Sequence, residues 1–146
     1  MILTDTGPLV ALLDADDSNH ARCIAIAAKL PLAPMLSTWP CFTEAMYLLG
    51  ALGGFRYQSV LWRLLADDKL VLYDLGTYEV ERMRTLMATY HDTPMDIADA
   101  SLVAVAESQD FQAIFSLDSD FISTAWLTAG FLRFLFRVPL FNRARR

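Results

Sequence analysis

Short apolar segments rich in strand-forming residues alternate along this sequence with longer segments of helical periodicity. Strands are expected at residues 2–4, 35–37, 70–75 and 113–117, and helices at about 8–13, 20–30, 40–49, 56–66, 79–90 and 97–108. Short apolar strands that alternate with helices favour a parallel sheet whose two faces are both covered by helices. We therefore expect a three-layer α/β/α fold around a central parallel sheet of about four to five strands.

The length and composition are those of one globular domain. The chain has 146 residues, of which 55% are hydrophobic and 20% are charged, and this balance excludes a disordered chain. It contains no repeat, linker or low-complexity segment, so residues 1–146 are taken as a single domain. With a formal net charge of −5, the protein lacks the overall basic character of many nucleic-acid binders.

The C-terminal segment 132–146 differs from the rest of the chain, because it carries five arginines and no acidic residue. An apolar stretch at 126–141 overlaps it, but Arg133 and Arg137 interrupt that stretch, which is also too short for an ordinary transmembrane helix. Residues 131–138 fit a last strand and a helix equally well. We expect no membrane span, and the structure of this basic, apolar-rich segment stays open.

The two cysteines, Cys23 and Cys41, are isolated and lack the spacing of a zinc site. Unpaired cysteines are typical of a reducing compartment. The opening residues show no basic segment followed by a long apolar run, as a signal peptide would. These features predict a cytoplasmic protein.

Carboxylates follow the first and the fourth of the expected strands. Asp5 comes directly after residues 2–4, and Asp118 follows residues 113–117. Because ligands bind at the carboxyl ends of parallel strands, we expect both side chains at that edge of the sheet. Capping of the helix that is expected to begin at Pro8 explains Asp5 equally well.

Three more carboxylates lie on expected helices. Glu44 is the only charged residue between Lys29 and Arg56, so we expect it to be largely packed and to have a partner. Asp96 and Asp99 are three residues apart and share one helix face. Helix capping explains Asp96 better than direct catalysis does, and a favourable first-turn charge is the alternative for Asp99.

Several carboxylates gathered at one edge of a sheet would repel one another and raise their pKa values. Neither of the two lysines, Lys29 and Lys69, follows a strand where it would neutralise them. A hard divalent cation such as Mg²⁺ or Mn²⁺ prefers oxygen ligands and relieves this repulsion. The pattern therefore predicts a divalent metal site.

Four segments, in this order, resemble the PIN domain family and, more closely, the VapC-type ribonuclease toxins of bacterial and archaeal toxin–antitoxin modules. They are DTGPLVALLD (5–14), TEAMYLL (43–49), MDIADASLVAVAE (95–107) and SLDSDF (116–121). The resemblance implies a metal site formed by Asp5, Glu44, Asp99 and Asp118. Thr6 and Ser116 fall where the family often has a hydroxyl near the site, and Asp96 is a secondary candidate that would act through water. No substrate-binding residue is identified.

The function implied by this resemblance is a Mg²⁺- or Mn²⁺-dependent endoribonuclease, the toxin of a VapBC-like system. Its expected partners are an RNA substrate of the tRNA or rRNA class, a cognate antitoxin protein and a second copy in a homodimer. The alternative is a catalytically weak PIN-like binding module that acts through protein partners. Large apolar side chains such as Trp62 and Phe131 favour that alternative, since some of them are expected in interfaces.

Overall fold

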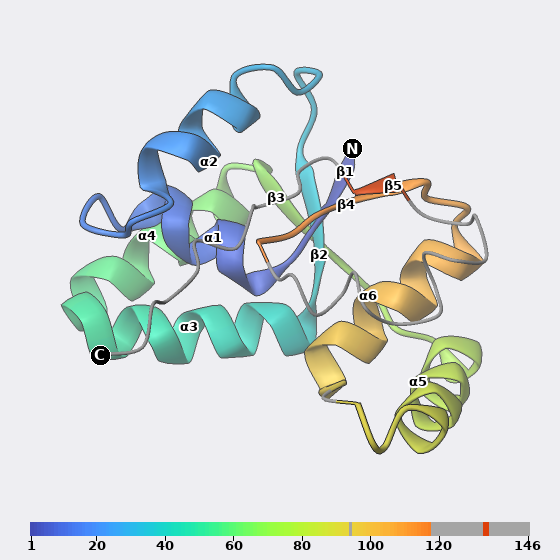
Figure 1. Ribbon diagram of the computed structural model, residues 1–146. Coiled ribbons are helices and arrows are strands. Elements are labelled where there is room, and N and C mark those ends of the chain that lie inside the picture. The colour runs from blue at the N-terminus through green and yellow to red at the C-terminus, as the bar shows by residue number, and fades with distance from the viewer. Residues whose placement is uncertain (94, 118–132, 135–146) are drawn as a thin grey trace, which may run out of the picture.

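The computed structural model describes residues 1–93, 95–117 and 133–134, and it shows a parallel sheet between layers of helices (Figure 1). The described strands are β1 (Ile2–Thr4), β2 (Met35–Thr38), β3 (Leu70–Tyr73), β4 (Ala113–Phe115) and β5 (Arg133–Phe134). They form one five-stranded sheet in the order β3-β2-β1-β4-β5, and every neighbouring pair is parallel. The predicted fold class is confirmed, and β5 falls inside the segment 131–138 that the sequence left open.

The described helices correspond to the predicted ones with small shifts at their ends. They are α1 (Thr6–Leu13), α2 (His20–Ala27), α3 (Trp39–Gly53), α4 (Phe55–Ala66), α5 (Thr77–Thr89) and α6 (Ile97–Ser108). Helix α1 begins two residues before Pro8, because Asp5 caps it, and Pro8 is tolerated as the third residue of the first turn. Gly54, with a φ of +63°, separates α3 from α4 and takes a conformation that favours glycine.

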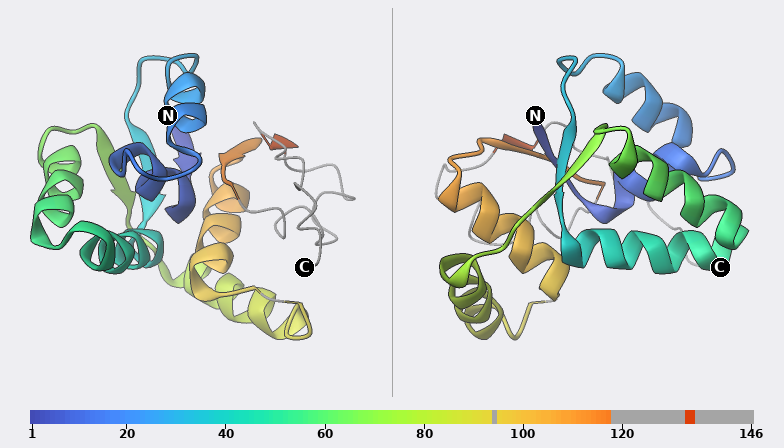
Figure 2. Two further views of the ribbon diagram at one scale, coloured as in Figure 1. Left: turned by 60° about the vertical axis from the view of Figure 1, so that its left-hand side comes forward. Right: turned by 180° about the vertical axis from the view of Figure 1, so that it is seen from behind.

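Successive side chains of β4 show how the sheet divides the core. Ile114 packs with Leu3 and Leu102 on the face covered by α5 and α6. The next residue, Phe115, packs with Ala11 and Cys23 on the face covered by α1 and α2. Alternate residues of a strand point to opposite faces, so β4 contributes side chains to both layers. Figure 2 shows the helices on the two faces of the sheet.

The topology brings three helix starts to the carboxyl edge of the sheet. Helix α1 follows β1 directly, and α3 follows β2 directly. Helix α6 packs against β1, β2 and β4, and it begins near the same edge (Figure 1). The N–H of Asp5 donates to the carbonyl oxygen of Phe115 at 2.9 Å, which fixes Asp5 beside the end of β4.

In the described ranges, no helix is long and apolar enough to cross a membrane. The expectations for Asp118 and for the side chains of 132–146 lie outside the described residues.

Candidate metal centre

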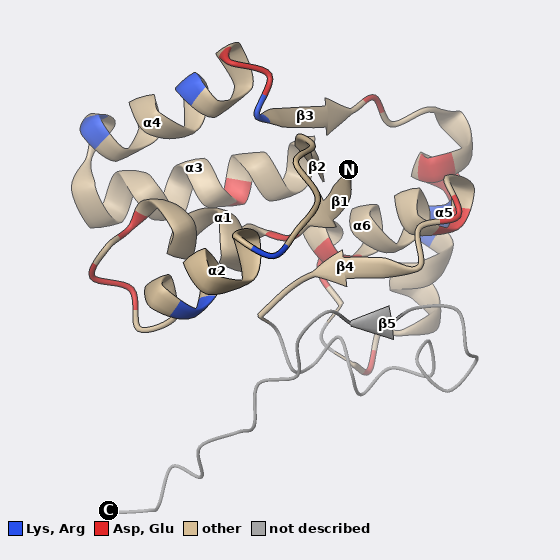
Figure 3. Ribbon diagram, turned by 90° about the horizontal axis from the view of Figure 1, so that it is seen from above, with Lys and Arg blue, Asp and Glu red and all other residues tan. Residues whose placement is uncertain are grey.

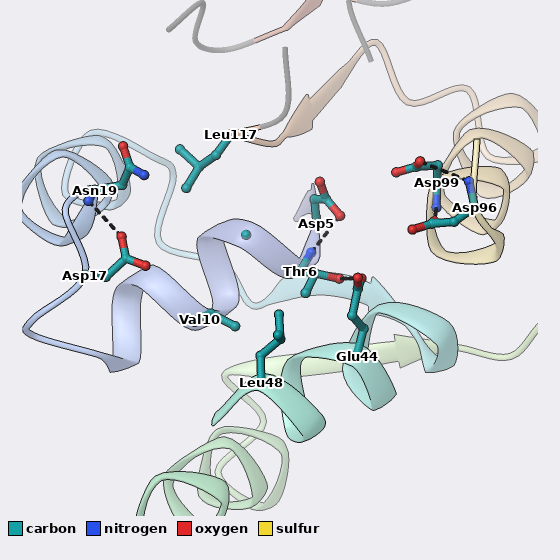
Figure 4. Close-up of a pocket in the computed structure, with 11 residues that line it drawn as sticks. Asp5, Thr6, Val10, Asp17, Asn19, Glu44, Leu48, Asp96, Asp99 and Leu117 are labelled. Carbon is teal, nitrogen blue, oxygen red and sulfur yellow. Dashed lines mark hydrogen bonds between the residues drawn. The ribbon is translucent and has the colours of Figure 1, made fainter. Parts of the chain in front are cut away.

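A pocket of about 400 Å³ opens between the starts of α1 and α6 and the middle of α3 (Figure 4). Its described lining residues are Asp5, Thr6, Gly7, Val10, Asp17, Asn19, Glu44, Leu48, Asp96, Asp99 and Leu117. Five of these side chains are carboxylates, and none of the described lining residues is a lysine or an arginine. The pocket is therefore strongly acidic.

Asp5 both caps α1 and lines the pocket, so the two explanations of this residue hold together. Its Oδ1 accepts the backbone N–H of Thr6 at 2.7 Å, and its Oδ2 accepts the hydroxyl of Ser116 at 2.7 Å. The side chains of Asp5 and Ser116 are buried. Two neutral donors, a backbone N–H and a hydroxyl, thus orient the Asp5 carboxylate.

Glu44 has the partner that its isolated position predicted, and that partner is a hydroxyl. The Thr6 side chain donates to Glu44 Oε2 at 2.7 Å. Glu44 is the only charged residue on α3 (Figure 3), and it is half-buried. Thr6 therefore connects the start of α1 to the middle of α3.

Asp96 and Asp99 form a reciprocal capping box at the start of α6. Asp96 Oδ1 accepts the N–H of Asp99 at 2.9 Å, and Asp99 Oδ2 accepts the N–H of Asp96 at 3.3 Å. The capping role expected for Asp96 is confirmed. Figure 4 shows this pair on one side of the pocket and Asp17 on the other, with Asp5 and Glu44 between them.

Cys41, at the start of α3, is a neighbour of the pocket that sequence reasoning missed. Its Sγ lies 4.0 Å from Asp5 Oδ1, and its thiol donates to the carbonyl oxygen of Ala98 at 3.8 Å. Burial, followed by the negative charge of Asp5, raises the pKa of the Cys41 thiol to about 12. The thiol stays protonated at neutral pH, so it is neither a thiolate ligand nor a nucleophile.

Asp17 and Asn19 also line the pocket, although their polar loop gave no sign of it. The N–H of Asn19 donates to Asp17 Oδ1 at 2.7 Å, so this carboxylate also orders a local turn.

The donor set fits a hard divalent cation by its chemistry. The side chains of Asp5, Glu44 and Asp99 offer oxygen donors only, which are the ligands that such a cation prefers. Among residues 1–93, 95–117 and 133–134, however, no three His, Cys, Asp or Glu side chains are grouped closely enough to hold a metal ion. Asp118, the fourth predicted ligand, lies outside those ranges, so the ligand assignment stays a prediction.

Comparison with known proteins shows the family to which this protein belongs. Residues 2–127 match the PIN domain model, and the chain belongs to the PIN domain family. Within this family it is similar to VapC proteins. Ribonuclease VapC26 of Mycobacterium tuberculosis is 29% identical over 121 residues, which are 80% of this chain and 86% of that protein.

A solved structure shows the same fold. The crystal structure of Mycobacterium tuberculosis VapC20, described as a sarcin-ricin loop cleaving toxin, matches with a TM-score of 0.78. The match covers 90% of this chain and 97% of VapC20, at 20% sequence identity. The predicted resemblance to VapC-like PIN domains is thereby confirmed.

Proposed function

We propose that this chain is a metal-dependent endoribonuclease and the toxin component of a VapBC-like toxin–antitoxin module. The observation that carries the proposal is a pocket in a PIN fold that combines Asp5 and Asp99, from the starts of α1 and α6, with Glu44 from the middle of α3. Similarity to a protein named as a ribonuclease supports the same activity.

Asp5, Glu44 and Asp99, with Asp118, are the residues that we propose to hold Mg²⁺ or Mn²⁺. A bound divalent ion supplies positive charge and Lewis acidity for attack of water on a phosphodiester. Ser116 and Thr6 orient the carboxylates of Asp5 and Glu44 through their hydroxyl protons. The described lining of the pocket carries five carboxylates and neither lysine nor arginine, so a bound divalent ion would make the pocket more favourable for an RNA phosphate.

The proposed partners are an RNA of the tRNA or rRNA class, a cognate antitoxin and a second copy of the chain, all in the cytoplasm. Exposed aromatic side chains on α3 and α4 support contacts with proteins. Trp39, Tyr47, Phe55 and Trp62 are all at least 46% exposed. Aromatic side chains at this exposure are enriched in protein interfaces.

The four exposed aromatic side chains on α3 and α4 also favour a second candidate function, a PIN-like binding module without significant catalysis. The two candidates differ in one respect that is readily measured. An enzyme releases new RNA ends in a metal-dependent way, and a binding module does not.

The test is RNA cleavage by the purified chain with Mg²⁺, with Mn²⁺ and after chelation by EDTA. We expect cleavage with either ion, loss of cleavage in EDTA and recovery when the ion is returned. Glu44→Gln should lower the rate of cleavage by about a hundredfold. Mutation of residues that only support the metal ligands typically lowers activity by about 10- to 100-fold, and loss of a ligand should cost at least as much. Glu81→Gln is the control, because the Glu81 side chain is exposed on the surface of α5 and pairs with Arg84.

Cleavage that persists undiminished in EDTA would refute metal dependence. A parent protein that cleaves no RNA but binds an antitoxin would support the binding module instead.

A further inference from the structure

One hydrogen bond joins two hydroxyl groups that are both completely buried between α3 and α6. Thr38 Oγ1 lies 2.6 Å from Ser101 Oγ, and both residues are 0% exposed. Thr38 ends β2 and is the N-cap of α3. Ser101 lies two residues after Asp99 on α6.

The direction of the protons in this contact follows from what each hydroxyl can donate. Ser101 has a single hydroxyl proton, which it donates to the carbonyl oxygen of Ala98 at 2.7 Å. The proton between the two hydroxyls therefore comes from Thr38. Thr38 Oγ1 in turn accepts the backbone N–H of Cys41 at 3.5 Å. A directed chain thus runs from Cys41 N–H through Thr38 and Ser101 to the carbonyl of Ala98.

Both ends of this row of hydrogen bonds lie close in sequence to candidate metal ligands. Cys41 precedes Glu44 by three residues, about one turn of α3. Ala98 is the residue immediately before Asp99. The Cys41 thiol reinforces the connection, since its Sγ contacts Asp5 Oδ1 and the carbonyl oxygen of Ala98. The hydroxyl pair therefore connects the turns that carry Glu44 and Asp99.

Leu36, Leu102 and Val103 belong to the buried apolar core on this face of the sheet, and apolar packing is not directional. The hydrogen bond between Thr38 and Ser101 is directional, so it restricts how α6, which carries Asp99, can turn relative to α3. A valine at position 38 would have a similar shape but would lack the hydroxyl.

We propose that Thr38 and Ser101 are positioning residues that hold Glu44 and Asp99 in register for a shared divalent ion. The inference rests on the proposed metal-dependent function and adds to it two residues that line no part of the pocket. Neither hydroxyl touches the ion or the RNA. Their effect is transmitted through the starts of α3 and α6.

The test compares Mn²⁺ binding by the full-length parent, Thr38→Val, Ser101→Ala and the conservative variant Thr38→Ser. Calorimetry gives the Mn²⁺ dissociation constant, and thermal melting in EDTA gives the stability of each metal-free protein. We expect Thr38→Val and Ser101→Ala to raise the dissociation constant about tenfold, as loss of outer groups does at metal sites. Thr38→Ser keeps the hydroxyl and should bind Mn²⁺ like the parent.

The matched control is Ser108→Ala. Ser108 also lies on α6, and its hydroxyl also donates to the carbonyl oxygen three residues earlier, that of Val105 at 3.4 Å, but in the last turn of α6 and outside the described pocket lining. This variant should keep the affinity of the parent for Mn²⁺. Because the two proposed hydroxyls act through one bond, Thr38→Val and Ser101→Ala combined should weaken Mn²⁺ binding no more than the worse single change.

Variants that melt at lower temperature but bind Mn²⁺ like the parent would show a merely structural role and overturn the inference. Absence of Mn²⁺ binding by the parent would also overturn it. RNA cleavage by the parent separates the two proposals. If the variants bind Mn²⁺ more weakly than the parent and the parent cleaves no RNA, the positioning role stands and the proposed activity fails. If it cleaves RNA and the variants keep its Mn²⁺ affinity, the activity stands and the positioning role fails.

Discussion

Asp5→Asn is expected to lower the rate of RNA cleavage by at least about a hundredfold while leaving the fold intact. Asparagine still caps a helix, so its side-chain oxygen keeps the bond from Thr6 N–H. It lacks the negative charge that a divalent ion requires. In the absence of metal, the variant should melt no earlier than the parent, because one charge is removed from a crowded acidic pocket.

The experiment measures initial cleavage rates and melting temperatures with and without Mn²⁺. The parent should be stabilised by the ion, and Asp5→Asn should lose that stabilisation. Asp14→Asn is the matched control, since Asp14 is also buried and follows the other end of α1, outside the described pocket lining. Equal activity of parent and Asp5→Asn, or equal losses in both variants, would contradict the assigned role.

Phe115→Ala is expected to cost about 3–5 kcal/mol of unfolding free energy, because it leaves a large cavity. Phe115 is 0% exposed and packs with Ala11, Cys23 and Ile26 under α1 and α2. Since small domains are typically stable by only about 5–15 kcal/mol, this single change removes a large share of the total. The backbone carbonyl of Phe115 also accepts the N–H of Asp5, so the cavity left by the substitution would lie next to a residue that lines the pocket.

Urea unfolding of both proteins at equilibrium measures this effect. Phe55→Ala provides the comparison, because Phe55 is 74% exposed at the start of α4 and should cost little. A similar cost for the two substitutions would mean that β4 and α1 do not pack as described.

The sequence predicted the fold well because each element carries a local signal. The apolar strands, the helix-forming runs and Gly54 after α3 all act within a few residues. The start of α1 was less certain, since both Asp5 and Pro8 mark helix starts, and the cap at Asp5 prevailed. Residues 131–138 had no decisive periodicity, and the pairing of β5 with β4 shows a strand at the two described residues of that segment, Arg133 and Phe134.

The candidate site was predictable where a charge stood in an unusual place. Asp5 followed a strand, and Glu44 was alone on an apolar helix, so both called for an explanation. The supporting hydroxyls were not predictable in the same way. Thr38 and Ser101 are 63 residues apart, and no local pattern pairs them. Only the packing of α6 against β2 and α3 brings them together.

The most direct measurement of the central claim is a crystal structure of the protein grown with Mn²⁺, with the ion located by its anomalous scattering. The account predicts a peak bound by carboxylate oxygens of Asp5, Glu44 and Asp99, with Asp118 beside them. A protein that cleaves RNA while its Mn²⁺ lies elsewhere, with these carboxylates retaining only their hydroxyl and capping partners, would contradict it.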